Sequence, residues 1–223
     1  MTITLAFDVY GTLIDTAGVV QKLERHVGTH ATSFSNLWRE KQLEYSFRRG
    51  LMQNYRDFSV CTRNALDYVR EYFQSPLTAA DKEELVTAYR FLPAFSEVKE
   101  AMIDLKASNC RLFAFSNGPP DDLQNLLGNA GLINFFEDVV SVDEIKSFKP
   151  NPAVYCHFLR RAGALGSETW LISSNPFDVI GAISAGMRSA WVKRSQRAIF
   201  DPWEIEPTVS IGSLLEIKQA IGI

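Results

Sequence analysis

The sequence has little cysteine, little histidine and no marked excess of charge. Its 223 residues include three cysteines and three histidines, and the formal net charge is −3. The cysteines are odd in number and far apart, so we expect free thiols that fill the core and no disulfide framework. The histidines form no pair with the spacing of metal ligands, and none stands beside a candidate nucleophile. These features argue against a zinc site and a Cys-His catalytic pair.

Long apolar runs and basic segments are also missing. No run approaches the roughly 20 apolar residues of a transmembrane helix, and the first residues lack a basic segment followed by a signal-peptide core. We therefore expect a cytoplasmic protein with no membrane partner. The slight negative balance also predicts no nucleic-acid partner, because nucleic-acid binding depends on an excess of positive charge. The 46% hydrophobic content is enough for one substantial core, with room for a smaller inserted domain.

Short apolar runs alternate with helical patterns over most of the chain, which is typical of the α/β class. The runs that predict strands are residues 3–7, 111–115, 138–141, 169–172 and 189–192. The helical patterns between and after them cover residues 97–107, 121–130, 152–162, 177–185 and 213–220. Repetition of this kind predicts a Rossmann-like parallel sheet with helices on both faces.

A long stretch after the first strand predicts helices only. The helical patterns there cover residues 17–26, about 34–49, 55–73 and 79–89. Ser33 or Ser35 can cap the second of these helices, and Thr78 with Asp81 three residues later can cap the fourth. Because a run of helices interrupts the alternating pattern, we expect a helical cap domain of residues 16–93 inserted in a core domain of residues 1–15 and 94–223.

Asp8 ends the first apolar run, directly before a turn that contains Gly11. Open α/β sheets bind ligands at the carboxyl ends of their strands, so Asp8 is a candidate nucleophile. An aspartate in such a position is also a common turn residue. Distant residues must decide between the two interpretations.

Polar residues also follow the later strands, and the carboxyl ends of parallel strands lie along one edge of a sheet. These residues are Ser116, Asn117, Lys149, Ser173, Asn175 and Asp178. A carboxylate beside an ammonium and several neutral donors is what displacement by a carboxylate would need. Each residue alone has a plainer interpretation, as a turn, a solvated cation or a helix start. Their joint occurrence in this order is what favours a site.

The motifs stand in the order Asp8-x-Tyr10-Gly11-Thr12, Ser116-Asn117, Lys149-Pro150 and Ser173-Ser174-Asn175-x-x-Asp178. This order resembles the haloacid dehalogenase (HAD) superfamily and, within it, the L-2-haloacid dehalogenases, over nearly the whole chain. The resemblance implies a hydrolase that converts short-chain L-2-haloalkanoic acids into D-2-hydroxyalkanoic acids. Asp8 would expel halide from the alpha carbon and form an ester, which water would cleave. The expected partners are the haloacid and the halide product, and a homodimer is a candidate assembly because dimers are common among relatives.

Tyr10 separates this branch from the phosphatases of the superfamily. The phosphatases carry a second aspartate two residues after the nucleophile, and an acidic cluster in the fourth motif holds magnesium. Here tyrosine takes the first position, and Asp178 alone is acidic in the fourth motif. We therefore expect no metal and no other cofactor. The alternatives are a HAD-type phosphatase that acts on a small phosphorylated metabolite and a non-catalytic binding protein on the same fold.

The resemblance also implies roles for residues around the nucleophile. The positions that match catalytic residues of the family are Asp8, Thr12, Arg39, Lys149, Ser173, Asn175 and Asp178. Lys149, Ser173 and Asn175 would hold and neutralise Asp8, while Asp178 would position or activate water.

A second set matches the residues that bind substrate in the family. Its members are Val9, Tyr10, Ser116, Asn117, Tyr155, Leu43, Phe58 and Phe177. Ser116 and the main-chain amides near Val9 and Tyr10 would bind the substrate carboxylate. Asn117 would receive the halide together with Arg39, which its surroundings alone would mark as an ordinary solvated side chain of a helix. The apolar members would form the wall around the carbon and halogen of the substrate. Many relatives carry tryptophan where this chain has Phe177.

Overall fold

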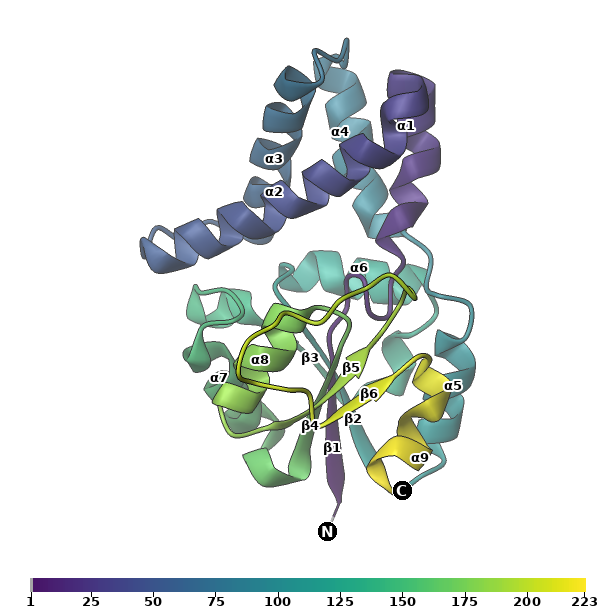
Figure 1. Ribbon diagram of the computed structural model, residues 1–223, viewed down its shortest axis with the longest axis vertical. Helices are drawn as coiled ribbons and strands as arrows, with labels where there is room; N and C mark the ends of the chain where they lie inside the picture. Colours follow the sequence, from purple (N-terminus) through teal and green to yellow (C-terminus); the bar gives the residue numbers. More distant parts are fainter. Residues whose placement is uncertain (1) are drawn as a thin grey trace.

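The protein is described by a computed structural model that covers residues 2–223. Its sheet has six strands, all parallel, in the order β3-β2-β1-β4-β5-β6 (Figure 1). The strands are β1 (Ile3–Phe7), β2 (Cys110–Ser116), β3 (Asp138–Ser141), β4 (Thr169–Ser173), β5 (Arg188–Val192) and β6 (Val209–Ile211). The predicted α/β class and the Rossmann-like parallel sheet are confirmed.

The central strand β1 carries side chains that are buried on both faces of the sheet. Leu5 and Phe7 belong to one apolar cluster and Ala6 to another, as expected for side chains that alternate along a strand. In Figure 1, α5 and α9 lie on one side of the sheet, and α7 and α8 on the other. The helices beside the sheet are α5 (Val98–Lys106), α6 (Pro120–Asn129), α7 (Pro152–Ala162), α8 (Pro176–Ser184) and α9 (Ile217–Ile221).

The strand order places β1 at the point where the chain changes direction across the sheet. From β1 the chain builds outward through β2 and β3, and it then returns to the other side of β1 with β4. In open α/β sheets, ligands bind at such a switch point, outside the carboxyl ends of the strands. The loops after β1, β2 and β4 therefore meet at one place.

The remaining helices form a separate group at the carboxyl edge of the sheet, and α2 runs across that edge (Figure 1). They are α1 (Val20–Val27), α2 (Ala31–Leu51), α3 (Phe58–Tyr72) and α4 (Ala79–Ala88). We call this group the helical segment. Thr78 and Asp81 form a complete capping box on α4, as predicted. No described helix combines the length and the apolar character that crossing a membrane requires.

The predicted cap of α2 by Ser33 or Ser35 is wrong. The helix already begins at Ala31, directly after a 3₁₀ turn at Gly28–His30, and the Ala31 N–H donates to the Gly28 carbonyl. The turn therefore runs into the helix without a capping side chain, and both serines lie inside the first turns. The Trp38 side chain on α2 is fully buried.

Two linkers join the helical segment to the rest of the chain, and they pair with each other. The Asp15 N–H donates to the Pro93 carbonyl at 2.8 Å, and the Phe95 N–H donates to the Leu13 carbonyl at 3.1 Å. The predicted boundaries at residues 15/16 and 93/94 fall beside this pairing. That the two parts are separate domains stays a prediction.

The C-terminal part differs most from the prediction. Strand β6 was not expected, because Val209–Ile211 is only three residues long and follows a long irregular stretch. The closing helix is a 3₁₀ turn, Leu214–Glu216, continued by the short α9. Ser213 caps the turn by accepting the Leu215 N–H. These elements extend the sheet away from the switch point.

Candidate active site

Asp8 lies at the carboxyl end of β1, and its side chain is almost buried. Its N–H donates to the Ile172 carbonyl at 3.0 Å, which continues the pairing of β1 with β4. The turn that follows needs Gly11, which has a φ of +83° and a Cβ position only 3.4 Å from the Ser174 hydroxyl. The chain therefore turns sharply after the strand and leaves the carboxylate at the edge of the sheet.

The two carboxylate oxygens of Asp8 have different surroundings. Oδ2 accepts three hydrogen bonds, from Asn175 Nδ2 at 2.7 Å, Thr12 Oγ1 at 2.9 Å and Ser173 Oγ at 3.2 Å. Among the described residues, Oδ1 is contacted by Lys149 Nζ alone, at 3.3 Å. Since each carboxylate oxygen offers about two lone-pair sites, Oδ2 is saturated while Oδ1 keeps electron density available for an incoming carbon.

Lys149 is buried between two carboxylates. Its Nζ lies 2.7 Å from Asp178 Oδ2 and 2.9 Å from the Phe115 carbonyl, in addition to its contact with Asp8. All three ammonium donors therefore have partners, which a buried ammonium needs if its desolvation is to be offset. Asn117 supports the loop, because its Oδ1 accepts the Lys149 N–H at 3.0 Å.

Asp178, in the first turn of α8, is fully buried. Burial raises the pKa of Asp178 to about 6, with the Lys149 charge acting against the shift and the Asp8 charge adding to it. Tyr155 donates its hydroxyl to Asp178 Oδ1 at 2.8 Å. Burial and the Asp178 charge raise the pKa of Tyr155, so its hydroxyl stays a donor at neutral pH. The result is a carboxylate that is a stronger base than an ordinary aspartate.

Three further donors belong to the carboxyl ends of β1 and β2, which are neighbouring strands. Ser116 is 1% exposed, and its Oγ accepts the Gly118 N–H at 3.2 Å, which leaves its hydroxyl proton available. Within residues 2–223, the N–H groups of Val9 and Tyr10 donate to no acceptor. Backbone amides that have no acceptor can bind an anion. The geometry suits the predicted substrate carboxylate.

Asn175 occupies the N-cap position of α8 but does not cap the helix with its side chain. Its Nδ2 donates to Asp8 instead, and this observation weighs against the plainer interpretation of Asn175 as a capping residue. If Asn175 only capped the helix, its side-chain amide would bond to the first backbone amides of α8. The side chain of Asn175, in the polar turn after β4, is instead directed toward the Asp8 carboxylate.

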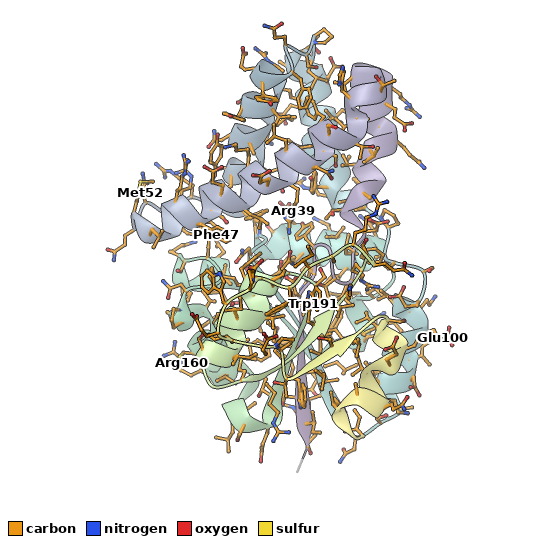
Figure 2. All side chains as sticks on the ribbon, in the orientation of Figure 1. Arg39, Phe47, Met52, Glu100, Arg160 and Trp191 are labelled. Atoms are coloured by element: carbon orange, nitrogen blue, oxygen red, sulfur yellow. The ribbon has the colours of Figure 1, made fainter. Side chains whose placement is uncertain are left out.

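Arg39 comes from the helical segment and is half-buried on α2. Figure 2 places its label between α2 and the sheet part of the molecule. Its Nη1 lies 3.5 Å from Gln42 Oε1, and Gln42 Nε2 donates to the Tyr89 hydroxyl at 3.0 Å. Burial raises the pKa of Tyr10, and the positive charge of Arg39 acts against this rise. Among the described residues, no hydrogen bond joins Arg39 to Asn117, the other predicted halide ligand.

The apolar residues predicted to form the wall come from both parts of the molecule. Phe177 of α8 packs edge-on against Phe47 of α2, with ring centroids 5.0 Å apart. Phe47 is labelled in Figure 2. Phe58 at the start of α3 is 7% exposed, and its ring centroid lies 6.3 Å from that of Phe148. Leu43 is half-buried and packs against the same cluster as Phe58. Phe47 is an addition to the predicted wall.

A pocket lies between the helical segment and the sheet part, beside Tyr10 and Phe58. Its other lining residues include Thr62, Tyr89 and Asp122. Two members of the predicted substrate set thus border one space, whereas Asp8 does not line it. No three His, Cys, Asp or Glu side chains gather as metal ligands in residues 2–223.

Comparison with known proteins gives one consistent family. Residues 4–186 match the profile of the haloacid dehalogenase-like hydrolases. The chain is 34% identical to "(S)-2-haloacid dehalogenase 2" of Pseudomonas sp. (strain CBS-3), over 98% of this chain and 95% of that protein. It is 35% identical to "Haloacetate dehalogenase H-2" of Moraxella sp. (strain B), over 98% and 97%. Its fold matches the structure of L-2-haloacid dehalogenase from Xanthobacter autotrophicus with chloropropionic acid covalently bound, with a TM-score of 0.92, 30% identity, and coverage of 100% and 99%.

Proposed function

The chain belongs to the haloacid dehalogenase-like hydrolases, and from this premise we propose that it hydrolyses short-chain L-2-haloalkanoic acids to D-2-hydroxyalkanoic acids. The observation that carries the proposal is the unequal hydrogen bonding of the two carboxylate oxygens of Asp8. One of its oxygens is held by three donors and the other faces only Lys149. The names of the relatives support the substrate class and its handedness.

In the first step, Asp8 Oδ1 attacks the alpha carbon from the side opposite the halogen. A carbon–oxygen bond forms, the carbon–halogen bond breaks, and the halide leaves with the bonding electrons. This displacement inverts the carbon and leaves an aspartyl ester. Halide is a stable anion that needs no proton, so tyrosine at position 10 is compatible with the reaction although it is a poor general acid near neutral pH.

The substrate carboxylate is bound by the Ser116 hydroxyl and the N–H groups of Val9 and Tyr10. These donors have no other acceptor among the described residues, which supports the assignment. The departing halide is received by Asn117 Nδ2 and Arg39. Asn117 can serve in this way because its Oδ1 is already bonded to the Lys149 N–H, which directs the Nδ2 donors elsewhere.

In the second step, water attacks the ester carbonyl carbon of Asp8, and Asp178 accepts the proton from water. The carbonyl oxygen at this stage is Oδ2, so the donors of Thr12, Ser173 and Asn175 stabilise the negative charge that develops on it. Collapse of the intermediate expels the product alkoxide, which takes up the proton held by Asp178. The second proton of the water passes from the new Asp8 carboxyl group to solvent, which restores the carboxylate. The oxygen of water remains in that carboxylate, while Oδ1 leaves with the product.

No metal or other cofactor takes part in this proposal. A hard divalent cation prefers several anionic oxygens, whereas Asp8 and Asp178 already share one ammonium. The same chemistry argues against the alternative HAD-type phosphatase. Leu43, Phe58 and Phe177 are proposed to line the space for the substrate alkyl group. The relative named for haloacetate adds haloacetates to the substrates that a survey should include.

The test measures chloride and hydroxyacid release from L- and D-2-chloropropionate in the presence of EDTA. We expect turnover of the L form only, with no effect of the chelator. Asp8→Asn should abolish turnover while the melting temperature stays near that of the wild type. Turnover that depends on added magnesium, or an active Asp8→Asn variant, would refute the mechanism. In heavy-oxygen water, a single turnover should label Asp8 first and not the product.

Three further features belong to the same proposal. The helical segment, residues 16–93, acts as a cap domain that brings Arg39 over the site. The enzyme works in the cytoplasm, with the haloacid as its small-molecule partner, and forms a homodimer. Light scattering of the purified protein tests the last point, and a monomeric mass at micromolar concentration would contradict it.

A further inference from the structure

The loop after β5 contains Arg194, which is not among the predicted site residues. Arg194 comes two residues after β5 ends at Val192, so it lies at the same carboxyl edge as Asp8. Trp191, labelled in Figure 2, marks the end of this strand near the middle of the sheet part. The Lys193 N–H donates to the Ile211 carbonyl at 2.8 Å, which holds the start of the loop against β6.

The Arg194 guanidinium joins the two linkers of the helical segment. Its Nη2 donates to the Thr12 carbonyl on the outgoing linker, and its Nη1 pairs with Glu97 just after the returning linker. Its carbon Cζ lies 4.0 Å from the centroid of the Phe95 ring. The side chain is 16% exposed, so these contacts are largely shielded from water. One forked group thus fixes both linkers at once, which a lysine ammonium could not do in the same geometry.

Thr12 connects this contact to the nucleophile. Its Oγ1 accepts the Ser174 N–H at 2.9 Å and donates to Asp8 Oδ2 at 2.9 Å. The amide N–H occupies one lone pair of the hydroxyl oxygen. Of the two acceptors within reach of the hydroxyl proton, Asp8 Oδ2 at 2.9 Å is nearer than Ser174 Oγ at 3.2 Å. The Thr12 carbonyl that Arg194 holds and the hydroxyl that Asp8 uses belong to the same residue.

We propose that Arg194 is a positioning residue, which holds Thr12 so that its hydroxyl stays on Asp8 Oδ2. Arg194 has no contact with the proposed substrate pocket and acts only through Thr12. The Glu97 carboxylate balances its charge. This inference rests on the proposed role of Asp8 as nucleophile.

The test compares Arg194→Met and Arg194→Lys with Arg188→Met on L-2-chloropropionate. Arg188 stands at the opposite end of the same strand and is exposed, so its variant is a matched control that should keep wild-type activity. We expect Arg194→Met to lower kcat between about 10-fold and about 100-fold with little change in KM, because a misplaced donor affects the reaction more than binding. Arg194→Lys keeps the charge but loses the fork, and kcat should fall by a smaller factor. Wild-type kcat in both Arg194 variants would overturn the proposal.

A double-mutant cycle with Thr12→Val separates positioning from general stability. If Arg194 acts through the Thr12 hydroxyl, Arg194→Met should change kcat little once that hydroxyl is gone. Equal losses in both backgrounds would overturn the proposal, and each kcat is referred to the folded fraction measured by circular dichroism. An inactive Asp8→Asn with a wild-type Arg194→Met refutes this inference alone, whereas an active Asp8→Asn refutes the proposed function.

Discussion

Removal of a donor from Asp8 Oδ2 should slow the second half of the reaction more than the first. Asn175 makes the shortest of the three bonds, at 2.7 Å, so Asn175→Ala is the most informative variant. In the free enzyme this donor stabilises a carboxylate, and its loss makes Oδ1 no weaker as a nucleophile. In ester hydrolysis the same donor faces a developing oxyanion, where removal of one donor costs about 3 kcal/mol, or roughly 100-fold in rate.

The assay is rapid-quench measurement of chloride with L-2-chloropropionate, followed by mass spectrometry of the intact protein. In Asn175→Ala we expect a burst of about one chloride per site and accumulation of the aspartyl ester, since alkylation outpaces hydrolysis. Asn36→Ala, at an exposed position of α2, is the control for the substitution itself. A lower kcat without a burst and without the ester would show that Asn175 acts on the displacement, and the assignment of Oδ2 as the later oxyanion would be refuted.

Three further outcomes follow from the same contacts. Lys149→Met leaves Asp8 and Asp178 buried without their shared cation, so the free energy of unfolding should fall by about 3–5 kcal/mol in urea titration, and an unchanged value would contradict the buried pair. The rate of ester hydrolysis should fall at acid pH as Asp178 is protonated, with a midpoint below the pKa of about 6 that Asp178 has in the free enzyme, because the ester carries no Asp8 charge. Tyr155→Phe removes a hydrogen bond that lowers the pKa of Asp178, so this acid limb should move to higher pH, and a limb at the same pH would refute the link. Gly11→Ala places a side chain at a φ of +83° and should cost about 1–3 kcal/mol in thermal unfolding, whereas a wild-type melting temperature would contradict the strain.

Much of the fold could be predicted because its signals are local. The run before Asp8 ends where β1 ends, and Asn151 caps α7 with its side chain on the Ala153 N–H, as its place before a proline indicates. The start of α2 could not be predicted from capping residues, since a preceding 3₁₀ turn replaces the cap. Strand β6 is too short to show the alternation of apolar and polar residues that predicts a strand, and only its pairing with β5 defines it. The resemblance to the haloacid dehalogenases is confirmed by the family profile and the relatives.

The candidate site was predictable as a set of loops but not as a set of bonds. Residues after β1, β2 and β4 meet because parallel strands share an edge, and this follows from topology. The sequence does not tell which oxygen of Asp8 receives three donors, nor that Asn117 supports Lys149 with its Oδ1. Arg194 could have been found in the same way, because it follows β5 and so lies at the same edge of the sheet. Its contact with the Thr12 carbonyl depends on how the two linkers pair, which no local pattern encodes.

The single ammonium between two carboxylates also governs the order of binding and release. With Asp8 and Asp178 ionised around Lys149, these three side chains carry a net charge of minus one, and an arriving carboxylate brings the total to minus two. In the proposed mechanism, Arg39 on α2 would offset part of this charge. Esterification would then remove the Asp8 charge before the halide departs, and hydrolysis would restore a charge that discourages the halide from returning. On this proposal, the changing charge of the site favours one direction of the cycle.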